Sequence, residues 1–276
     1  MSGDHCTDVS LLNLGKLTPA VIKLITATEK AIGGIFKPMQ IRRVARAKAD
    51  AILIAAEADA KKQEIAYRAA GRIAYLEVQR QTNIESIIKE AAKVVPENVT
   101  DDPVDPDWMS YFFDECKDVG NTEVQEIWGK LLAGEVEKPG TFSRKAMSIL
   151  KTLSSNDARL FKQFCSMMFL VDHEPGVIAP LYDRLSRSLS SHMDPLGLVM
   201  NMFDVVEGER LERICYWDKH YKIVSKTSNP TARMIAVKRF SPAGVELARL
   251  VARQQDDIVE AVNLSLIKQE AELVPA

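Results

Sequence analysis

The sequence predicts a mainly α protein. We expect a long, coiled-coil-like N-terminal helix, a compact helical middle block and a small α+β, winged-helix-like module at the C-terminal end. Three observations predict this class: apolar residues recur every eleven positions between 47 and 91, helix caps punctuate the middle of the chain, and β-branched and aromatic residues gather after 213. The expected segments are 1–37 (lead-in and amphipathic helix), 38–95 (long Ala-rich helix), 96–170 (helical block) and 171–276 (strand-containing module).

The composition is that of an ordinary globular chain. Of its 276 residues, 46% are hydrophobic and 27% are charged, and the net charge is −2. This balance excludes a global field that would draw the whole chain onto nucleic acid or anionic lipid. The four cysteines form no CxxC pair, and the first ten residues lack the basic start of a signal peptide, so we expect a cytoplasmic protein.

Residues 18–36 predict a short amphipathic helix with Thr18 as its N-cap and Pro19 in its first turn. A group that we name the basic collar follows it: Lys37, Arg42, Arg43, Arg46 and Lys48. An apolar helix beside cations is how interfacial helices bind anionic membranes, so contact with a membrane or vesicle surface is one expected role. A buried helix followed by a solvated one is the alternative.

The long helix is expected from about residue 39 to residue 94, before Pro96, with a length of ~85 Å. An eleven-residue period corresponds to about 3.67 residues per turn, which favours a straight or weakly right-handed packing seam. The predicted seam consists of Ile54, Ala58, Ile65, Ala69, Leu76 and Ile87. Such a stripe requires cover from the chain's own helical block, a second copy or an operon-encoded partner, and we favour self-association. A break near Gly71 that folds the helix back is the structural alternative.

The middle block is predicted from its punctuation. Residues 96–107 form an acidic linker that contains prolines but lacks the glycine and terminal glutamate of a calcium loop, so we expect no metal there. Four helices follow, and the expected second helix ends at Gly134. Their expected N-caps are Asp105, Asn121 or Thr122, Ser143, and Ser154 with Asp157 in a capping box.

The C-terminal part mixes helices and strands. In chain order we expect short helices at 181–189 and 196–206, strands at 214–224 and 234–240, and helices at 241–251 and 256–273.

Basic and aromatic residues alternate between 213 and 239. Cations contact phosphates and aromatic rings stack on bases, so this segment is a candidate nucleic-acid hairpin. The candidate contacts are Trp217, Lys219, Tyr221, Lys222 and Arg239. The same aromatic residues could instead fill the core of a small module. A nucleic-acid-binding regulator is therefore the alternative function.

No catalytic, cofactor or metal signature stands out. The four histidines share no HExxH or HxH pattern, and the chain has no GxSxG, Walker loop or GxGxxG. We therefore expect a non-enzymatic protein without a cofactor.

Two stretches carry a resemblance to known proteins: IGGIFKPMQIRRVARAKA at 32–49 and EIWGKLLAGEVEKPGTFS at 126–143. Together they resemble an uncharacterised bacterial domain-of-unknown-function family, in which an Ala-rich helix precedes such a hairpin and a strand-containing tail. The hairpin is also similar to the alpha-type abortive-infection proteins of phage defence. The resemblance covers about residues 30–255 and implies a bacterial cytosolic sensor or adaptor subunit of an antiphage system, with no catalytic residues to transfer.

Overall fold

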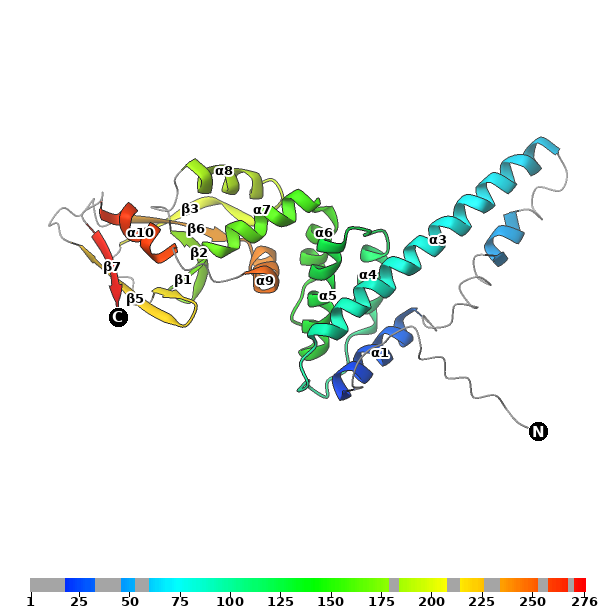
Figure 1. The fold of residues 1–276 in the computed structure, drawn as a ribbon, viewed down its shortest axis with the longest axis horizontal. Coiled ribbons are helices and arrows are strands. Elements are labelled where there is room, and N and C mark those ends of the chain that lie inside the picture. Colours follow the sequence, from blue (N-terminus) through cyan, green and yellow to red (C-terminus); the bar gives the residue numbers. More distant parts are fainter. Residues whose placement is uncertain are drawn as a thin grey trace. The chain divides into compact units, whose positions relative to one another are not determined.

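The computed structural model describes residues 18–32, 46–52, 60–178, 184–207, 214–225, 234–252, 258–267 and 271–276. The chain divides into two compact units, Met1–Met147 and Ser148–Ala276 (Figure 1). The first is helical, and the second combines helices with an antiparallel sheet. The predicted class, mainly helical with strands toward the C-terminal end, is confirmed at this level.

The first unit is an assembly of capped helices. Its helices are α1 (Pro19–Ile32), α3 (Ala60–Val94), α4 (Pro106–Cys116), α5 (Thr122–Glu137) and the start of α6 (Arg144–Thr152). Three predicted caps are confirmed, because Thr18 accepts from the N–H of Val21, Asp105 from that of Asp107, and Asn121 from that of Val124. Each cap satisfies an N–H group that the helix itself leaves free.

Helix α1 packs into this unit through its apolar face. Ala20, Val21 and Leu24 are buried, and the helix contacts α4 and α5. The Lys23 Nζ donates hydrogen bonds to the carbonyl oxygens of Thr100 and Val136, at 2.6 and 2.9 Å. The apolar face of α1 is therefore part of the protein core. This agrees with the alternative reading of the sequence, in which the helix is buried and does not bind a membrane.

The long helix differs from its expected extent. Helix α3 begins at Ala60, and residues 46–52 form a separate helical segment (Figure 1). The Lys48 Nζ lies 3.5 Å from a carboxylate oxygen of Glu77. Residues 29 positions apart in one straight helix would be separated by about 44 Å, so a continuous helix cannot make this contact. Helix α3 passes without interruption through Gly71, the position of the alternative break.

Helices α3 and α5 approach closely at a glycine. A Cβ atom added to Gly129 would lie 2.6 Å from the Cβ of Glu90, which is too close for two carbon atoms. The absence of a side chain at Gly129 lets α5 cover Ile87, Ile88 and Ala91, all of which are fully buried. This packing forms one wall of the core of the first unit.

A buried carboxylate organises the turn between α5 and α6. Glu135 is 1% exposed. One carboxylate oxygen accepts the N–H of Gly140 at 2.6 Å, and the other accepts the N–H groups of Thr141 and Phe142, both at 3.0 Å. Gly140 has a φ of +84°, which glycine adopts without strain. We name this arrangement the Glu135 clamp.

The predicted helix end at Gly134 is wrong, because α5 continues to Glu137. Gly134 has a packing role instead: a Cβ atom there would lie 2.8 Å from the ring of Phe142. Phe142 is buried, and its carbonyl oxygen accepts a 2.7 Å hydrogen bond from the indole of Trp108. The clamp thereby joins the turn to α4 as well as to α5.

Replacing Glu135 with alanine tests the clamp. The change leaves three backbone N–H groups without their acceptor, so we expect the free energy of unfolding to fall by roughly 3 kcal/mol or more. Urea denaturation followed by circular dichroism measures it. Glu137→Ala is the matched control in the same helix, since that side chain is exposed, and should stay within about 0.5 kcal/mol. Equal effects of the two changes would contradict the clamp.

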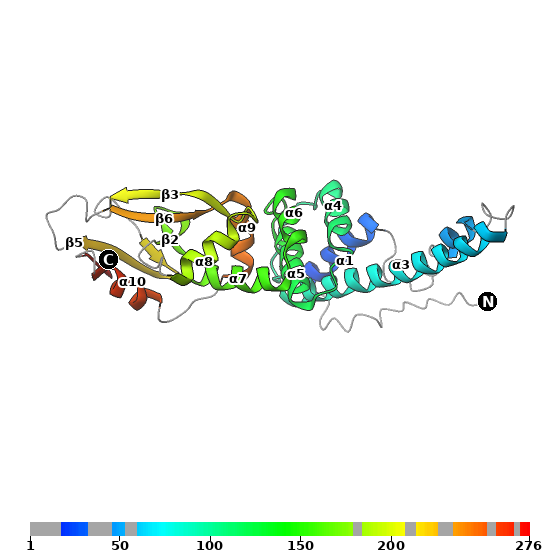
Figure 2. The same cartoon turned by 90° about the horizontal axis from the view of Figure 1, so that it is seen from above.

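The second unit is built on a seven-stranded antiparallel sheet with the order β3-β6-β2-β1-β4-β5-β7. Figure 2 shows its neighbouring strands β3 and β6 side by side. The strands are β1 (Phe169–Val171), β2 (Glu174–Ile178), β3 (Val199–Glu207), β4 (Ile214–Tyr216), β5 (Lys219–Ser225), β6 (Met234–Phe240) and β7 (Ala271–Pro275). The helices are α7 (Ser155–Ser166), α8 (Arg184–Met193), α9 (Pro242–Val251) and α10 (Ile258–Ile267).

Helix α7 starts at the predicted capping box and packs on the sheet. Ser154 accepts the N–H of Asp157, and the Asp157 carboxylate accepts the N–H of Ser154. Burial tends to raise the pKa of Asp157, but hydrogen bonds from Ser154 and His192 outweigh it and leave this pKa below its usual value. Further along α7, the Phe164 ring lies 5.3 Å from that of Phe240 on β6.

Four strands, β1, β2, β3 and β7, depart from the sequence prediction. Residues 199–207 form β3 rather than a helix, and the last expected helix ends at Ile267 before β7. A short apolar run is compatible with a helix or a strand. Residues 199–207 form a strand because they pair with β6. The β1–β2 hairpin was missed because its two-residue turn, Asp172-His173, lacks the usual Asn-Gly or Asp-Gly signal, although both residues have positive φ.

Candidate functional site

The predicted seam on α3 has two different environments. Ile87 is fully buried beneath α5, whereas Ile65 and Leu76 are 54% and 38% exposed. Ala69 is half-buried, and Ile54 and Ala58 lie outside the described residues. The stripe is thus covered by α5 at its C-terminal end, while Ile65 and Leu76 are exposed on the same part of α3 as Ala66 and Ala70, which are buried. We name the part of α3 from 60 to 80 the α3 arm.

The arm carries further large side chains at its surface. Tyr67, Tyr75 and Val78 are 61%, 65% and 48% exposed. Arg68 and Arg72 are also exposed on this helix. Tyrosine and arginine supply much of the binding energy in protein interfaces, because each combines apolar area with directed polar groups. Exposed aromatic, aliphatic and cationic side chains thus occur around the arm.

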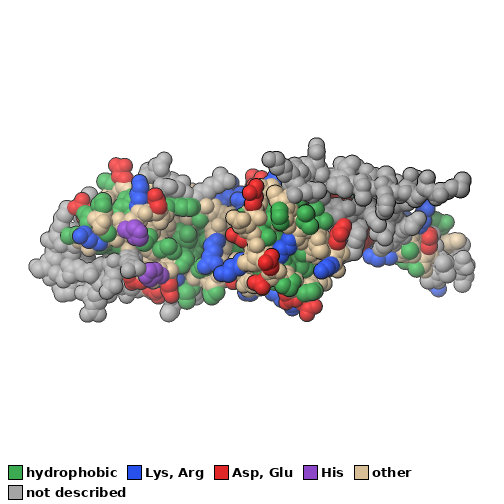
Figure 3. Space-filling model, turned by 90° about the horizontal axis from the view of Figure 1, so that it is seen from below, with side chains coloured by type: hydrophobic (Ala, Val, Ile, Leu, Met, Phe, Trp, Pro, Cys, Tyr) green, Lys and Arg blue, Asp and Glu red, His purple; other side chains and the backbone are tan. Residues whose placement is uncertain are grey.

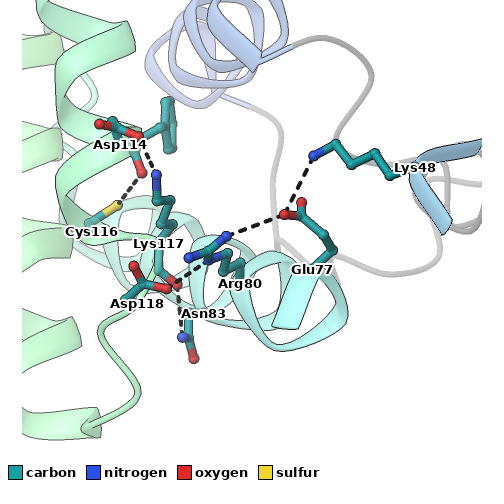
Figure 4. A network of polar contacts seen from close by, with 9 residues as sticks. Lys48, Glu77, Arg80, Asn83, Asp114, Cys116, Lys117 and Asp118 are labelled. Carbon is teal, nitrogen blue, oxygen red and sulfur yellow. Dashed lines mark hydrogen bonds and ion pairs between the residues drawn. The ribbon is translucent and has the colours of Figure 1, made fainter. Parts of the chain in front are cut away.

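A polar network anchors the base of the arm (Figure 4). The Arg80 guanidinium donates to Asp118 at 2.8 Å and to Glu77 at 3.3 Å, and Glu77 also pairs with Lys48. The side-chain amide of Asn83 donates to the carbonyl oxygen of Lys117 at 2.9 Å. These contacts fasten the α4–α5 turn and the segment 46–52 to α3. The contacts involve Glu77, Arg80 and Asn83, so they lie on α3 between the exposed Leu76 and the buried Ile87.

The basic collar is described only in part. Arg46 and Lys48 lie on the helical segment 46–52 and are exposed, and Lys48 pairs with Glu77. Lys37, Arg42 and Arg43 lie outside the described residues. Because the apolar face of α1 is buried, α1 provides no free apolar face for the two described collar cations. None of the helices in the described ranges combines the length and apolarity required to cross a bilayer.

The candidate nucleic-acid contacts do not share one surface. Tyr221 is 8% exposed, so its ring is in the core and cannot stack on a base. Side chains alternate along a strand, so Lys219 and Lys222 point to opposite faces of β5. Trp217 is 46% exposed at the tip of the β4–β5 turn, with a φ of +57°. Two hairpin cations on opposite faces do not make a continuous basic patch.

The last candidate of this group, Arg239, has a structural role. It is 7% exposed, and its guanidinium donates to the Asp204 carboxylate at 2.8 Å and to the carbonyl oxygens of Val171 and Glu174, both at 3.0 Å. In the pairing of β6 with β2, Arg239 lies opposite Gly176. Through its Nε and Nη1 atoms, the guanidinium therefore ties β6 to β3 and to the β1–β2 turn. The prediction that Arg239 contacts nucleic acid is not compatible with this burial.

The buried thiols are also structural. Burial raises the pKa values of Cys116 and Cys165 well above those of ordinary thiols, which keeps both protonated and unreactive. Cys215 is half-buried and lies 3.2 Å from the Nδ1 of His220. Within the described ranges, no three His, Cys, Asp or Glu side chains are grouped so that they could hold a metal ion. On the face drawn in Figure 3, side chains of both charges are interspersed with hydrophobic ones.

The contrast between the two ends of the stripe gives a direct stability test. Ile87→Asp places a carboxylate in the core and should lower the free energy of unfolding by several kcal/mol, roughly 3 or more. Ile65→Asp, at an equivalent position two repeats earlier, should change it by about 0.5 kcal/mol or less because the site is exposed. Thermal or urea unfolding measures both. A large loss in Ile65→Asp would show that the chain itself covers the arm.

Comparisons with known proteins agree with the assignment to an uncharacterised family. Residues 67–184 match a family described as "Protein of unknown function (DUF2806)". This match begins in the α3 arm and includes the Glu135 clamp. No curated protein and no solved structure matches the chain.

Proposed function

We propose that this chain is a non-enzymatic adaptor that binds a protein partner through the α3 arm and serves as a sensor or adaptor subunit in bacterial phage defence. The observation that carries the binding role is the divided stripe. Ile87 is buried under α5, and its repeat partners Ile65 and Leu76 are exposed. A stripe that packs a helix at one end has the shape and spacing to pack another helix at the other, in a coiled-coil-like pairing.

The role in defence rests on a different observation. The hairpin at 126–143, which contains the Glu135 clamp, resembles that of the alpha-type abortive-infection proteins. The clamp residues shape the turn, so this motif supports a shared fold rather than a shared chemistry. An adaptor without chemistry of its own is consistent with the buried, protonated state of Cys116 and Cys165.

A membrane or vesicle surface is a weaker candidate for the partner. Arg46 and Lys48 could meet anionic headgroups, but interfacial binding also needs an apolar face that inserts between lipids. The face of α1 that the sequence suggested for this is occupied by its contacts with α4 and α5. The arm offers tyrosines and isolated aliphatic residues among arginines, which suits a protein surface better.

The alternative function, a nucleic-acid-binding regulator with a winged-helix-like module, depends on the β4–β5 hairpin. With Tyr221 and Arg239 buried, its remaining candidates are Trp217, Lys219 and Lys222. Two cations contribute little salt-dependent affinity. Each neutralised phosphate adds only about one unit to the slope of log K against the logarithm of the salt concentration. We therefore expect no gel shift with duplex DNA at about 0.15 M salt. A salt-dependent shift that Lys222→Glu abolishes would favour this alternative.

Phage protection tests the proposed function. In the native host, Ile65→Asp/Leu76→Asp should raise phage plaque counts to those of a strain that lacks the gene, because two carboxylates on the stripe prevent burial against a partner. The matched control is Lys89→Glu, an exposed change on the covered half of α3, and it should protect like the wild type. Full protection by the double variant would overturn the proposal, provided that circular dichroism shows both variants folded.

A further inference from the structure

Cys215 differs from the two other cysteines in the described part of the chain. Cys116 and Cys165 are buried, and burial raises their pKa values, so both thiols stay protonated. Cys215 is half-buried, and its Sγ lies 3.2 Å from the Nδ1 of the exposed His220. A partly accessible thiol therefore contacts a group that can accept its proton.

The β4–β5 hairpin holds this contact in place. Cys215 and His220 face each other across the two strands. The carbonyl oxygen of His220 accepts the N–H of Ala276, so it points away from β4. This direction is that of a non-hydrogen-bonded pair, in which the facing side chains lie closest to each other. Strand β4 is also paired with β1 on its other side, so the sulfur is fixed relative to the ring.

The pair lies on an open part of the sheet. Leu170, Cys215 and His220 form a row across β1, β4 and β5 on one face. Leu170 is 39% exposed, and His220 is exposed as well. The neighbours of Cys215 on its strand, Ile214 and Tyr216, point to the opposite face and are buried. A small reagent can therefore reach the sulfur from the side on which the imidazole lies.

We propose that Cys215 is a redox modification site, at which hydrogen peroxide oxidises the thiol with His220 as the proton acceptor. When the neutral ring carries its proton on Nε2, its Nδ1 accepts the thiol proton. The sulfur then attacks one peroxide oxygen, an S–O bond forms and the O–O bond breaks. The leaving hydroxide takes the proton back from the ring and departs as water. The sulfur is oxidised to a sulfenic acid, and the peroxide is reduced.

This chemistry is independent of the α3 arm and of the proposed adaptor role. Each event consumes one thiol, so the protein is modified and does not turn over a substrate. Hydrogen peroxide is small and uncharged, and it requires access to the sulfur rather than a shaped cavity. Susceptibility to peroxide follows the exposure of the thiol and the ease with which it loses its proton, and the Cys215–His220 pair supplies both.

Replacing His220 with glutamine tests the role of the imidazole. The full-length chain is treated with hydrogen peroxide and dimedone, and the labelling rate of the Cys215 peptide is measured by mass spectrometry. At pH 7 the rate should fall about tenfold or more in His220→Gln, because glutamine cannot accept the proton. At about pH 10 the difference should disappear, since thiols ionise there without a base. His173→Gln, a change of another exposed histidine, should react like the wild type. Equal rates in His220→Gln and the wild type at pH 7 would overturn the proposal.

A second measurement needs no variant and decides the matter if His220→Gln fails to fold. Iodoacetamide labelling at pH 7 is compared between the native chain and the chain in urea. Unfolding exposes every thiol but separates Cys215 from His220. Cys215 should therefore react several-fold faster in the native chain, whereas Cys116 and Cys165 should react faster in urea because unfolding uncovers them. A Cys215 that reacts faster in urea would overturn the proposal, because its native environment would then only shield it.

Discussion

The Glu135 carboxylate is the contact on which the first unit depends. It is buried in α5 and accepts three backbone N–H groups from the turn that leads to α6. That turn presents Phe142 to Gly134 and to the Trp108 indole. A buried charge is stable only when its hydrogen bonds are complete, so the turn and the helix require each other. Helix α5, fixed in this way, provides the surface that covers half of α3.

The proposed role of α3 depends on where α5 stops covering it. Gly129 lets α5 approach Ile87 and Ala91, and the Arg80–Asp118 and Asn83–Lys117 contacts close the packed region at the α4–α5 turn. Beyond this point the same stripe continues with Ile65 and Leu76 at the surface. The division requires no special chemistry. It follows from a short helix that covers part of a longer one, and it leaves a surface whose pattern is already suited to helix packing.

Sequence patterns predicted the local structure well and the long-range structure only in part. Caps such as Asp105 and Ser154 act through neighbours within three residues, so their signals are complete in the sequence. The contact between Lys48 and Glu77, and the choice of strand for residues 199–207, depend on partners far along the chain. Glu135 was missed because an acidic residue near a helix end usually indicates solvent. The adjacent Pro139-Gly140 turn, with its free N–H groups, was the available signal. For the candidate site, the eleven-residue period located the stripe but could not show which half α5 covers, and the burial of Arg239 follows from pairing with Gly176 that no local pattern reveals.

Hydroxyl-radical footprinting tests the central claim most directly, because it reports the cover of individual side chains. The account predicts that Ile65 and Leu76 are labelled in the isolated chain, whereas Ile87 is protected. Protection of Leu76 equal to that of Ile87 would contradict the claim that the chain leaves these side chains uncovered.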